Sequence, residues 1–341
     1  MANRKTRRTL ALTALFCLST LTACGEDSNT HAQPVNAPVE GVTVQLLNAG
    51  EGSAQPLVWF TGPDEQKVKF SFTQGLEQKT LVDEEKLKKQ QAEDRAKQSA
   101  TQSSDSSAST TAPSFTTESN TDDLDVPYDE VTMDLPLTTN IHTDGHVRTS
   151  TVTVGRPSGS NTERNEDVAT AEGFTMVTEQ NLNGRVQNRN FSAPESATDS
   201  ARASVEQALT RMNDVPIIFP DEPIGVGGKW KVSNRIDENG TSMLQDIIYT
   251  LSERQNKTVK LGVEVKRRPA TKQLADTDLE VLDVSSESTG HIVLNLTHAL
   301  PERGSVKVTT TTTYGQKDSA VKVIQTTMAK TSWAQSEEKQ D

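Results

Sequence analysis

Residues 304–314 have the sequence Gly-Ser-Val-Lys-Val-Thr-Thr-Thr-Thr-Thr-Tyr, in which valine alternates with polar side chains before threonine takes over. Successive side chains of a β-strand point to opposite faces of the sheet, and β-branched residues are typical of strands. One face of this stretch is apolar only briefly, at Val306 and Val308, and the rest is threonine. The stretch therefore predicts a strand in a sheet that has one face exposed to water.

The same alternation recurs along the whole chain and predicts a protein that is mainly β. Strands are expected at residues 42–46, 68–72, 79–82, 130–137, 147–154, 173–180, 184–191, 229–236, 242–252, 258–266, 279–287, 290–296, 304–314 and 320–333. Turns are expected at Gly75 and at residues 143–145, 181–184, 237–240 and 287–290. Short strands joined by such turns predict a curved, mostly antiparallel meander sheet that resembles half of a barrel.

One segment breaks the strand pattern and predicts a single packed α-helix at residues 196–213. Its apolar residues recur at helical spacing and are Ala201, Val205, Ala208, Leu209 and Met212. Asp199 or Ser200 is expected to cap the N-terminus of this helix. Because the apolar stripe consists of small and medium side chains, we expect the helix to lie close against the concave face, as the only substantial helix of the folded body.

A low-complexity insertion at residues 84–125 interrupts the strands. Its first part, residues 84–98, is charged and predicts a short exposed helix, and the rest consists mostly of Ser, Thr, Asp and Gln. Such a composition lacks the apolar residues needed to form a core. We therefore expect one β-rich domain at residues 41–334, interrupted by this insertion and followed by a charged tail at residues 335–341.

The N-terminus has the features of a bacterial lipoprotein signal peptide. Four basic residues precede an apolar stretch at residues 9–20, which is too short to span a bilayer. The stretch ends in Leu21-Thr22-Ala23-Cys24, which resembles the lipobox in which the cysteine is acylated after cleavage. An ordinary cleavage site beside a bystander Cys24 is the alternative, but the chain has no cysteine beyond residue 24 to pair with it.

These features predict a signal peptide at residues 1–23, lipidation at Cys24 and a disordered tether at residues 24–40. Two or more acyl chains on one residue give stable membrane anchoring. Removal of residues 1–23 takes away four basic residues and no acidic one, so the net charge falls from −12 to −16. Such an acidic chain is unsuited to nucleic acid. We expect a protein anchored on the extracytoplasmic face of a bacterial cell membrane.

Sequence motifs for catalysis are absent, and we expect neither an enzyme nor a cofactor or metal site. The chain contains no Gly-x-Ser-x-Gly elbow and no His-Glu-x-x-His helix. His142 and His146 have no third ligand at a fixed spacing, so they predict surface histidines. Residues 225–228 are glycine-rich, but they follow the expected helix and open a strand, which is the reverse of a dinucleotide-binding turn.

The segment from residue 216 to residue 230 is the most distinctive part of the chain. It combines prolines, glycines and a tryptophan, namely Pro216, Pro220, Pro223, Gly225, Gly227 and Trp230. With the helix before it and the strands after it, this segment resembles the signature of an uncharacterised family of bacterial, largely actinobacterial, cell-envelope lipoproteins. That family has no assigned activity. The order of anchor, strands, one helix and further strands is also similar to half-barrel envelope proteins that carry lipids or lipoproteins.

The second similarity implies an apolar pocket between the helix and the sheet. The side chains that would line it are Phe174, Val205, Leu209, Met212, Ile217, Phe219, Trp230 and Tyr249. The alternative is that they fill the core, since a chain with 4% aromatic residues needs them for burial. An apolar pocket predicts a binding module for a lipid or other apolar ligand. A filled core predicts a structural or protein-interaction module of the cell envelope, with a closed core and a cell-envelope protein as partner.

Overall fold

The computed structural model describes residues 35–36, 41–62, 65–101, 125–238, 241–271 and 279–335. The expected signal peptide, Cys24, most of the tether, the second half of the 84–125 insertion and most of the charged tail lie outside these residues.

The described residues form strands and a few helices. The strands are β1 (Val35–Asn36), β2 (Thr43–Asn48), β3 (Glu51–Gln55), β4 (Gln66–Val82), β5 (Val126–Asp144), β6 (Val147–Val154), β7 (Ser158–Gly159), β8 (Thr175–Asn181), β9 (Val186–Ser192), β10 (Ile224–Val226), β11 (Lys229–Glu238), β12 (Thr241–Gln255), β13 (Thr258–Pro269), β14 (Glu280–Asn295), β15 (Arg303–Gly315) and β16 (Val321–Gln335). The helices are α1 (Glu84–Thr101), α2 (Asn165–Ala169), α3 (Asp199–Met212) and the 3-10 helix η3 (Thr162–Arg164).

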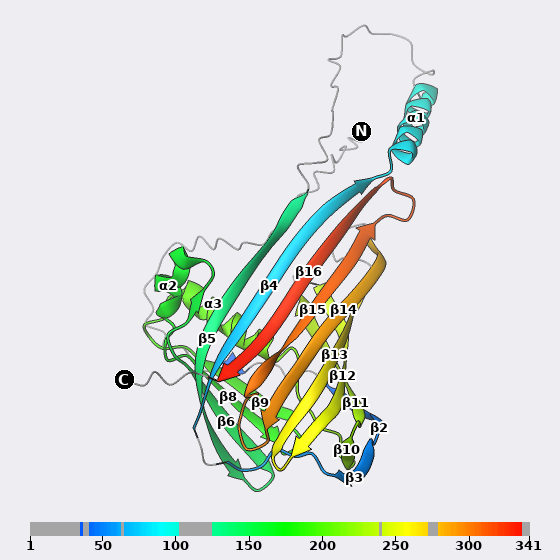
Figure 1. Ribbon diagram of the computed structural model, residues 1–341. Coiled ribbons are helices and arrows are strands. Elements are labelled where there is room, and N and C mark those ends of the chain that lie inside the picture. The colour runs from blue at the N-terminus through cyan, green and yellow to red at the C-terminus, as the bar shows by residue number, and fades with distance from the viewer. Residues whose placement is uncertain are drawn as a thin grey trace, which may run out of the picture.

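Fourteen strands form one sheet in which neighbouring strands run antiparallel. The order is β1-β9-β8-β6-β5-β4-β16-β15-β14-β13-β12-β11-β2, with β7 paired to β5 outside this path. The path ends at β1 and β2, so the sheet curves without closing into a barrel. Figure 1 shows this curvature, with α2 and α3 beside one half of the sheet and α1 at the far end of β4. The predicted curved antiparallel meander is confirmed.

Several strands are longer than predicted, because glycines expected to form turns lie within strands. β4 continues through Gly75, and β14 continues through residues 287–290 without a turn. A Cβ added at Gly75 would lie 2.5 Å from the hydroxyl oxygen of Tyr128 on β5, so the tyrosine ring covers the glycine. At Gly290, an added Cβ would lie 3.0 Å from the backbone oxygen of Val263. These glycines permit close approach of a neighbouring strand.

The helix at the predicted position is α3, and its buried side chains are the five that the helical spacing predicted. The predicted caps are wrong by one or two residues, because the hydroxyl oxygen of Thr198 accepts the hydrogen bond from the backbone N–H of Ala201 at 3.1 Å. Between β7 and β8 the chain forms the short helices η3 and α2. Val168 and Ala169 are buried there and anchor this short helical segment.

The core lies on the concave face of the sheet and includes the apolar side of α3. Val68 and Phe70 of β4 and Val306 and Val308 of β15 belong to one buried cluster with Leu209 of α3.

Threonines continue this inner face toward the far end of the sheet. Thr310 and Thr312 are only 2% and 4% exposed, so the inner face stays buried beyond its last valine. The outer face of β15, with Lys307 exposed and Thr309 partly exposed, is the one that contacts water.

Candidate binding cleft beside helix α3

A cleft of about 830 Å³ lies beside α3, where the sheet remains open. One wall comes from the β9 end of the strand order and another from β11, near the opposite end. Arg185, just before β9, donates a hydrogen bond from Nη1 to the backbone oxygen of Val42, just before β2, at 2.6 Å. This contact bridges the two ends of the sheet at the edge of the cleft.

The walls of the cleft combine apolar and charged side chains. The apolar lining residues are Val42, Val186, Phe191, Ala203, Pro216, Ile218 and Ile236. The charged lining residues are Arg185, Arg189, Arg211, Arg235, Glu206, Asp214 and Asp237. In ligand sites, apolar side chains supply contact area and polar groups fix the orientation of the ligand, and both kinds are present here.

Arg189 of β9 lies in the cleft with few protein partners. Its Nη2 donates to the side-chain oxygen of Asn213 at 2.9 Å, and Asn213 in turn donates from Nδ2 to the backbone oxygen of Leu209 at 2.7 Å. Nε of Arg189 is buried and has no hydrogen-bond partner among the described residues. Burial lowers the pKa of Arg189 to about 10. The guanidinium therefore keeps its charge at neutral pH in a poorly solvated place.

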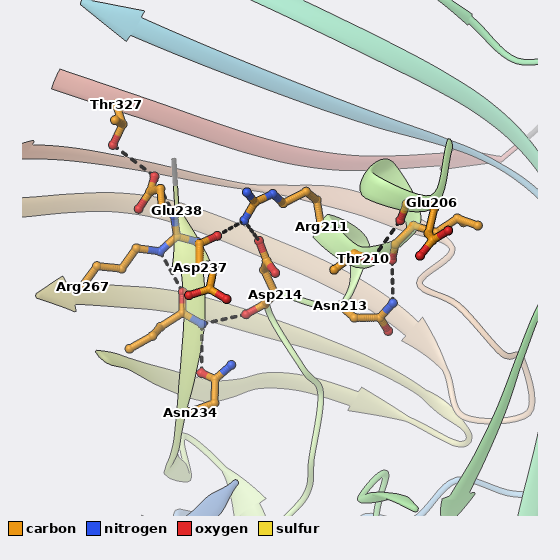
Figure 2. A network of polar contacts seen from close by, with 12 residues as sticks. Glu206, Thr210, Arg211, Asn213, Asp214, Asn234, Asp237, Glu238, Arg267 and Thr327 are labelled. Atoms are coloured by element: carbon orange, nitrogen blue, oxygen red, sulfur yellow. Dashed lines mark hydrogen bonds and ion pairs between the residues drawn. The ribbon is translucent and has the colours of Figure 1, made fainter. Parts of the chain in front are cut away.

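A network of polar contacts lies at the C-terminal end of α3 (Figure 2), and its members Arg211, Asp214 and Asp237 line the cleft. Nη1 of Arg211 lies 3.2 Å from Oδ2 of Asp214 and also donates to the backbone oxygen of Asp237. Gln245 of β12 donates from Nε2 to the backbone oxygen of Asp214 at 2.6 Å and to the side-chain oxygen of Asn234 at 3.0 Å. The network thereby ties α3 to β11 and β12.

The network continues across the concave face to β16. Arg267 of β13 donates from Nε to the side-chain oxygen of Gln245 at 2.8 Å, and its Nη1 lies 3.4 Å from Oε1 of Glu238. The same Glu238 oxygen accepts a hydrogen bond of 3.0 Å from Thr327 of β16. The side chains of Arg267 and Glu238 are only 3% and 12% exposed, so the ion pair is shielded from water.

A second cavity, of about 350 Å³, lies on the other side of this network. Its apolar lining residues are Phe72, Leu76, Val126, Val131, Met328 and Ala329. Arg211 and Asp214 line both cavities, so this ion pair stands between them. The charged network therefore stands between two cavities whose walls are partly apolar.

The pKa of the Asp214 carboxyl is shifted in this network. Burial raises the pKa of its carboxyl from 3.8 to about 6, although Arg211 and Arg267 both favour the charged form. Desolvation therefore outweighs the attraction of two arginines at this position.

The eight side chains that the sequence suggested for an apolar pocket lie together in the core. Phe174, Val205, Leu209, Met212, Phe219, Trp230 and Tyr249 are buried, and Ile217 packs against them. The ring of Trp230 stacks on Tyr249 with centroids 5.2 Å apart, and its Nε1 donates to the backbone oxygen of Ile218 at 2.8 Å. None of the eight lines either of the two cavities described above. This arrangement corresponds to the alternative in which the eight side chains fill the core.

The residues that do line the cleft were not singled out from the sequence. Arg189 carried one usable signal, since it lies two residues before Phe191 and so shares a strand face with a buried aromatic side chain. Arg211 and Asp214 pair at i,i+3 spacing at the end of α3, which is a local contact. Glu238 and Arg267 join them only through the arrangement of the strands, and their spacing in the chain carries no such signal.

The described ranges contain no group of three or more His, Cys, Asp or Glu side chains placed to hold a metal ion. Within the same ranges, no helix combines the length and apolar character needed to cross a membrane. No protein-family model matches this chain, and no curated protein matches it.

Proposed function

We propose that this protein is a lipoprotein anchored through Cys24 on the extracytoplasmic face of a bacterial cell membrane, and that its β domain is a non-enzymatic binding module for a lipid or other apolar ligand. The cleft beside α3 is the observation that carries the binding proposal. Its volume of about 830 Å³ falls within the range of roughly 300–1,000 Å³ that is usual for small-molecule sites.

The chemistry of the cleft walls supports an apolar ligand. Side chains such as Phe191, Ile218 and Ile236 supply contact area that releases about 25 cal/mol for each Å² removed from water. The cleft also lies at the unclosed side of the sheet, so a ligand has a route in from solvent. An acyl chain delivered from the membrane that holds the anchor fits both features.

The second candidate function is a structural or protein-interaction module of the cell envelope. The packed space between α3 and the sheet favours it, because Trp230, Tyr249 and Leu209 are buried there and line neither of the two cavities described above. This candidate needs no ligand in the cleft beside α3 and takes a cell-envelope protein as its partner.

Native mass spectrometry distinguishes the two candidates. The full-length protein would be purified from bacterial membranes in detergent and measured before and after extraction with organic solvent. A stoichiometric lipid, beyond the covalent anchor, that disappears on extraction supports the binding module. A bare mass that persists after lipids are added would overturn it in favour of the structural module.

The anchor is tested separately by Cys24→Ala. We expect this variant to stay as an uncleaved precursor or to leave the membrane fraction, because the acyl chains that hold the protein cannot be attached. Cys17→Ala is the matched control, since Cys17 lies within the apolar stretch and is removed on cleavage. Maturation and membrane retention of Cys24→Ala equal to those of the wild type would refute lipidation at this residue.

A further inference from the structure

Arg189 is the charged group of the cleft that has a buried N–H without an acceptor among the described residues. It pairs with no carboxylate of the described residues, and its single acceptor is the neutral side chain of Asn213. The bond from Asn213 Nδ2 to Leu209 fixes the amide so that its oxygen points toward the guanidinium. A buried N–H that lacks an acceptor is costly unless another group completes its hydrogen bonding.

The other arginines of the cleft are committed to protein groups or lie at the surface. Arg211 pairs with Asp214, and Arg185 donates to the backbone oxygen of Val42. Arg235 is exposed. Arg185 and Arg235 also lack a carboxylate partner, but Arg189 is the cleft arginine with a buried N–H that finds no acceptor among the described residues, and it lies two residues from the apolar side chain of Phe191 on the same face of β9.

A guanidinium beside apolar walls is complementary to an amphipathic anion. Carboxylate and phosphate oxygens accept charge-assisted hydrogen bonds from arginine, which are stronger than neutral ones. A neutral apolar ligand would fill the same walls but would give the guanidinium of Arg189 no charged partner. The cleft thus favours a ligand that carries a negative head on an apolar body.

Building on the proposed function, we propose that the cleft beside α3 binds amphipathic lipids by an anionic head, with Arg189 as the residue that selects it. An oxygen of the head accepts from the guanidinium of Arg189, and the apolar chain lies along Val186, Ile218 and Ile236. A fatty-acid carboxylate and a lipid phosphate share this chemistry, and the two are separated below by experiment.

The test is competition for photolabelling of the cleft. The full-length protein in phosphatidylcholine nanodiscs is labelled with a diazirine analogue of hexadecanoic acid, and the labelled peptides are identified by mass spectrometry. Unlabelled hexadecanoate, hexadecyl phosphate and hexadecanol then compete at equal mole fractions in the bilayer. We expect at least one of the two anions to compete about tenfold or more better than the alcohol, which is the selectivity expected for one hydrogen bond to a charged group.

Variants assign that preference to Arg189. In Arg189→Gln we expect the anions to lose their advantage while competition by hexadecanol stays unchanged, which also shows that the cleft is intact. Arg189→Lys should retain part of the preference. Arg156→Gln, whose side chain is 61% exposed and pairs with Glu166, is the control and should behave as the wild type.

The outcomes separate the two proposals. If the alcohol and both anions suppress labelling of the cleft equally in the wild type, the selection of an anionic head is overturned. The proposed binding module is not affected by that outcome. A labelling pattern that avoids the cleft peptides altogether would overturn the binding module itself and this inference with it. If hexadecanoate and hexadecyl phosphate differ, the stronger competitor identifies the head group.

Discussion

Thr327 of β16 donates a hydrogen bond of 3.0 Å to Oε1 of Glu238 at the end of β11, although four strands separate β16 from β11 in the sheet. The bond crosses the concave face, so the sheet is curled tightly enough for side chains five strands apart to touch. Arg267 of β13 holds the same carboxylate oxygen at 3.4 Å. This polar contact therefore helps to set the curvature that encloses the apolar interior.

We expect Arg267→Ala to lower the free energy of unfolding by about 3–5 kcal/mol, because it leaves the Glu238 carboxylate largely buried without its charged partner. Urea unfolding followed by circular dichroism measures the change. Lys260→Ala is the matched control on the same strand, since the Lys260–Glu253 pair is 45% and 59% exposed. Such exposed pairs contribute about 1 kcal/mol or less. Similar losses in the two variants would show that the Arg267–Glu238 pair is as weak as a surface ion pair.

The raised pKa of Asp214 predicts a pH-dependent stability. Because the folded protein holds the proton more tightly than the unfolded chain, the contribution of Asp214 is fully present below its unfolded pKa near 3.8 and is lost as the pH rises through about 6. At about 1.4 kcal/mol per pKa unit, the loss between pH 4 and pH 7 is roughly 2–3 kcal/mol.

The measurement is the difference in unfolding free energy between the wild type and Asp214→Asn at several pH values. We expect the wild type to lose stability relative to this variant as the pH rises, because the asparagine does not ionise. Asp144→Asn, at an exposed position of the β5–β6 hairpin, should leave the profile of the wild type unchanged. A difference between wild type and Asp214→Asn that is constant from pH 4 to pH 7 would contradict the prediction.

The alternation of side chains was enough to predict the class of fold, and α3 was found from its spacing of apolar residues. Strand lengths were harder to predict, because a glycine in a strand and a glycine in a turn look alike in sequence. At Gly75 the difference depends on Tyr128, which is far along the chain and covers the glycine from the neighbouring strand. Local sequence carries no information about such a partner.

The cleft was less predictable than the fold, because its residues come from opposite ends of the sheet. Phe219, Trp230 and Tyr249 were recognisable as large apolar side chains, and they pack in the core, as apolar residues usually do. Arg189 and Asp214 gain their unusual environments from burial by distant elements. Which strands meet across the concave face depends on curvature, and the alternation pattern does not determine curvature.

The turn that leads into Arg185 depends on Gly184. This residue has a φ of +94°, and a Cβ there would lie 2.3 Å from the backbone oxygen of Ile217. We expect Gly184→Ala to destabilise the protein by clearly more than Gly145→Ala. Gly145 also has a positive φ, but an added Cβ meets nothing within 4 Å, so its cost is only the roughly 1–2 kcal/mol of the left-handed conformation. Equal shifts in thermal unfolding would mean that the contact with Ile217 relaxes freely.

The separation of core from cleft along α3 predicts opposite effects for two of its residues. Leu209 is fully buried and lines neither cavity, so Leu209→Ala should lower the unfolding free energy by about 2–5 kcal/mol while the folded protein still takes up lipid. Ala203 is exposed and lines the cleft, so Ala203→Phe should leave stability nearly unchanged and reduce photolabelling of the cleft. Leu81→Ala, at a side chain 51% exposed at the end of β4, is the control for both measurements. If Leu209→Ala instead abolished labelling without loss of stability, the ligand would lie between α3 and the sheet, among the aromatic residues, and not in the cleft.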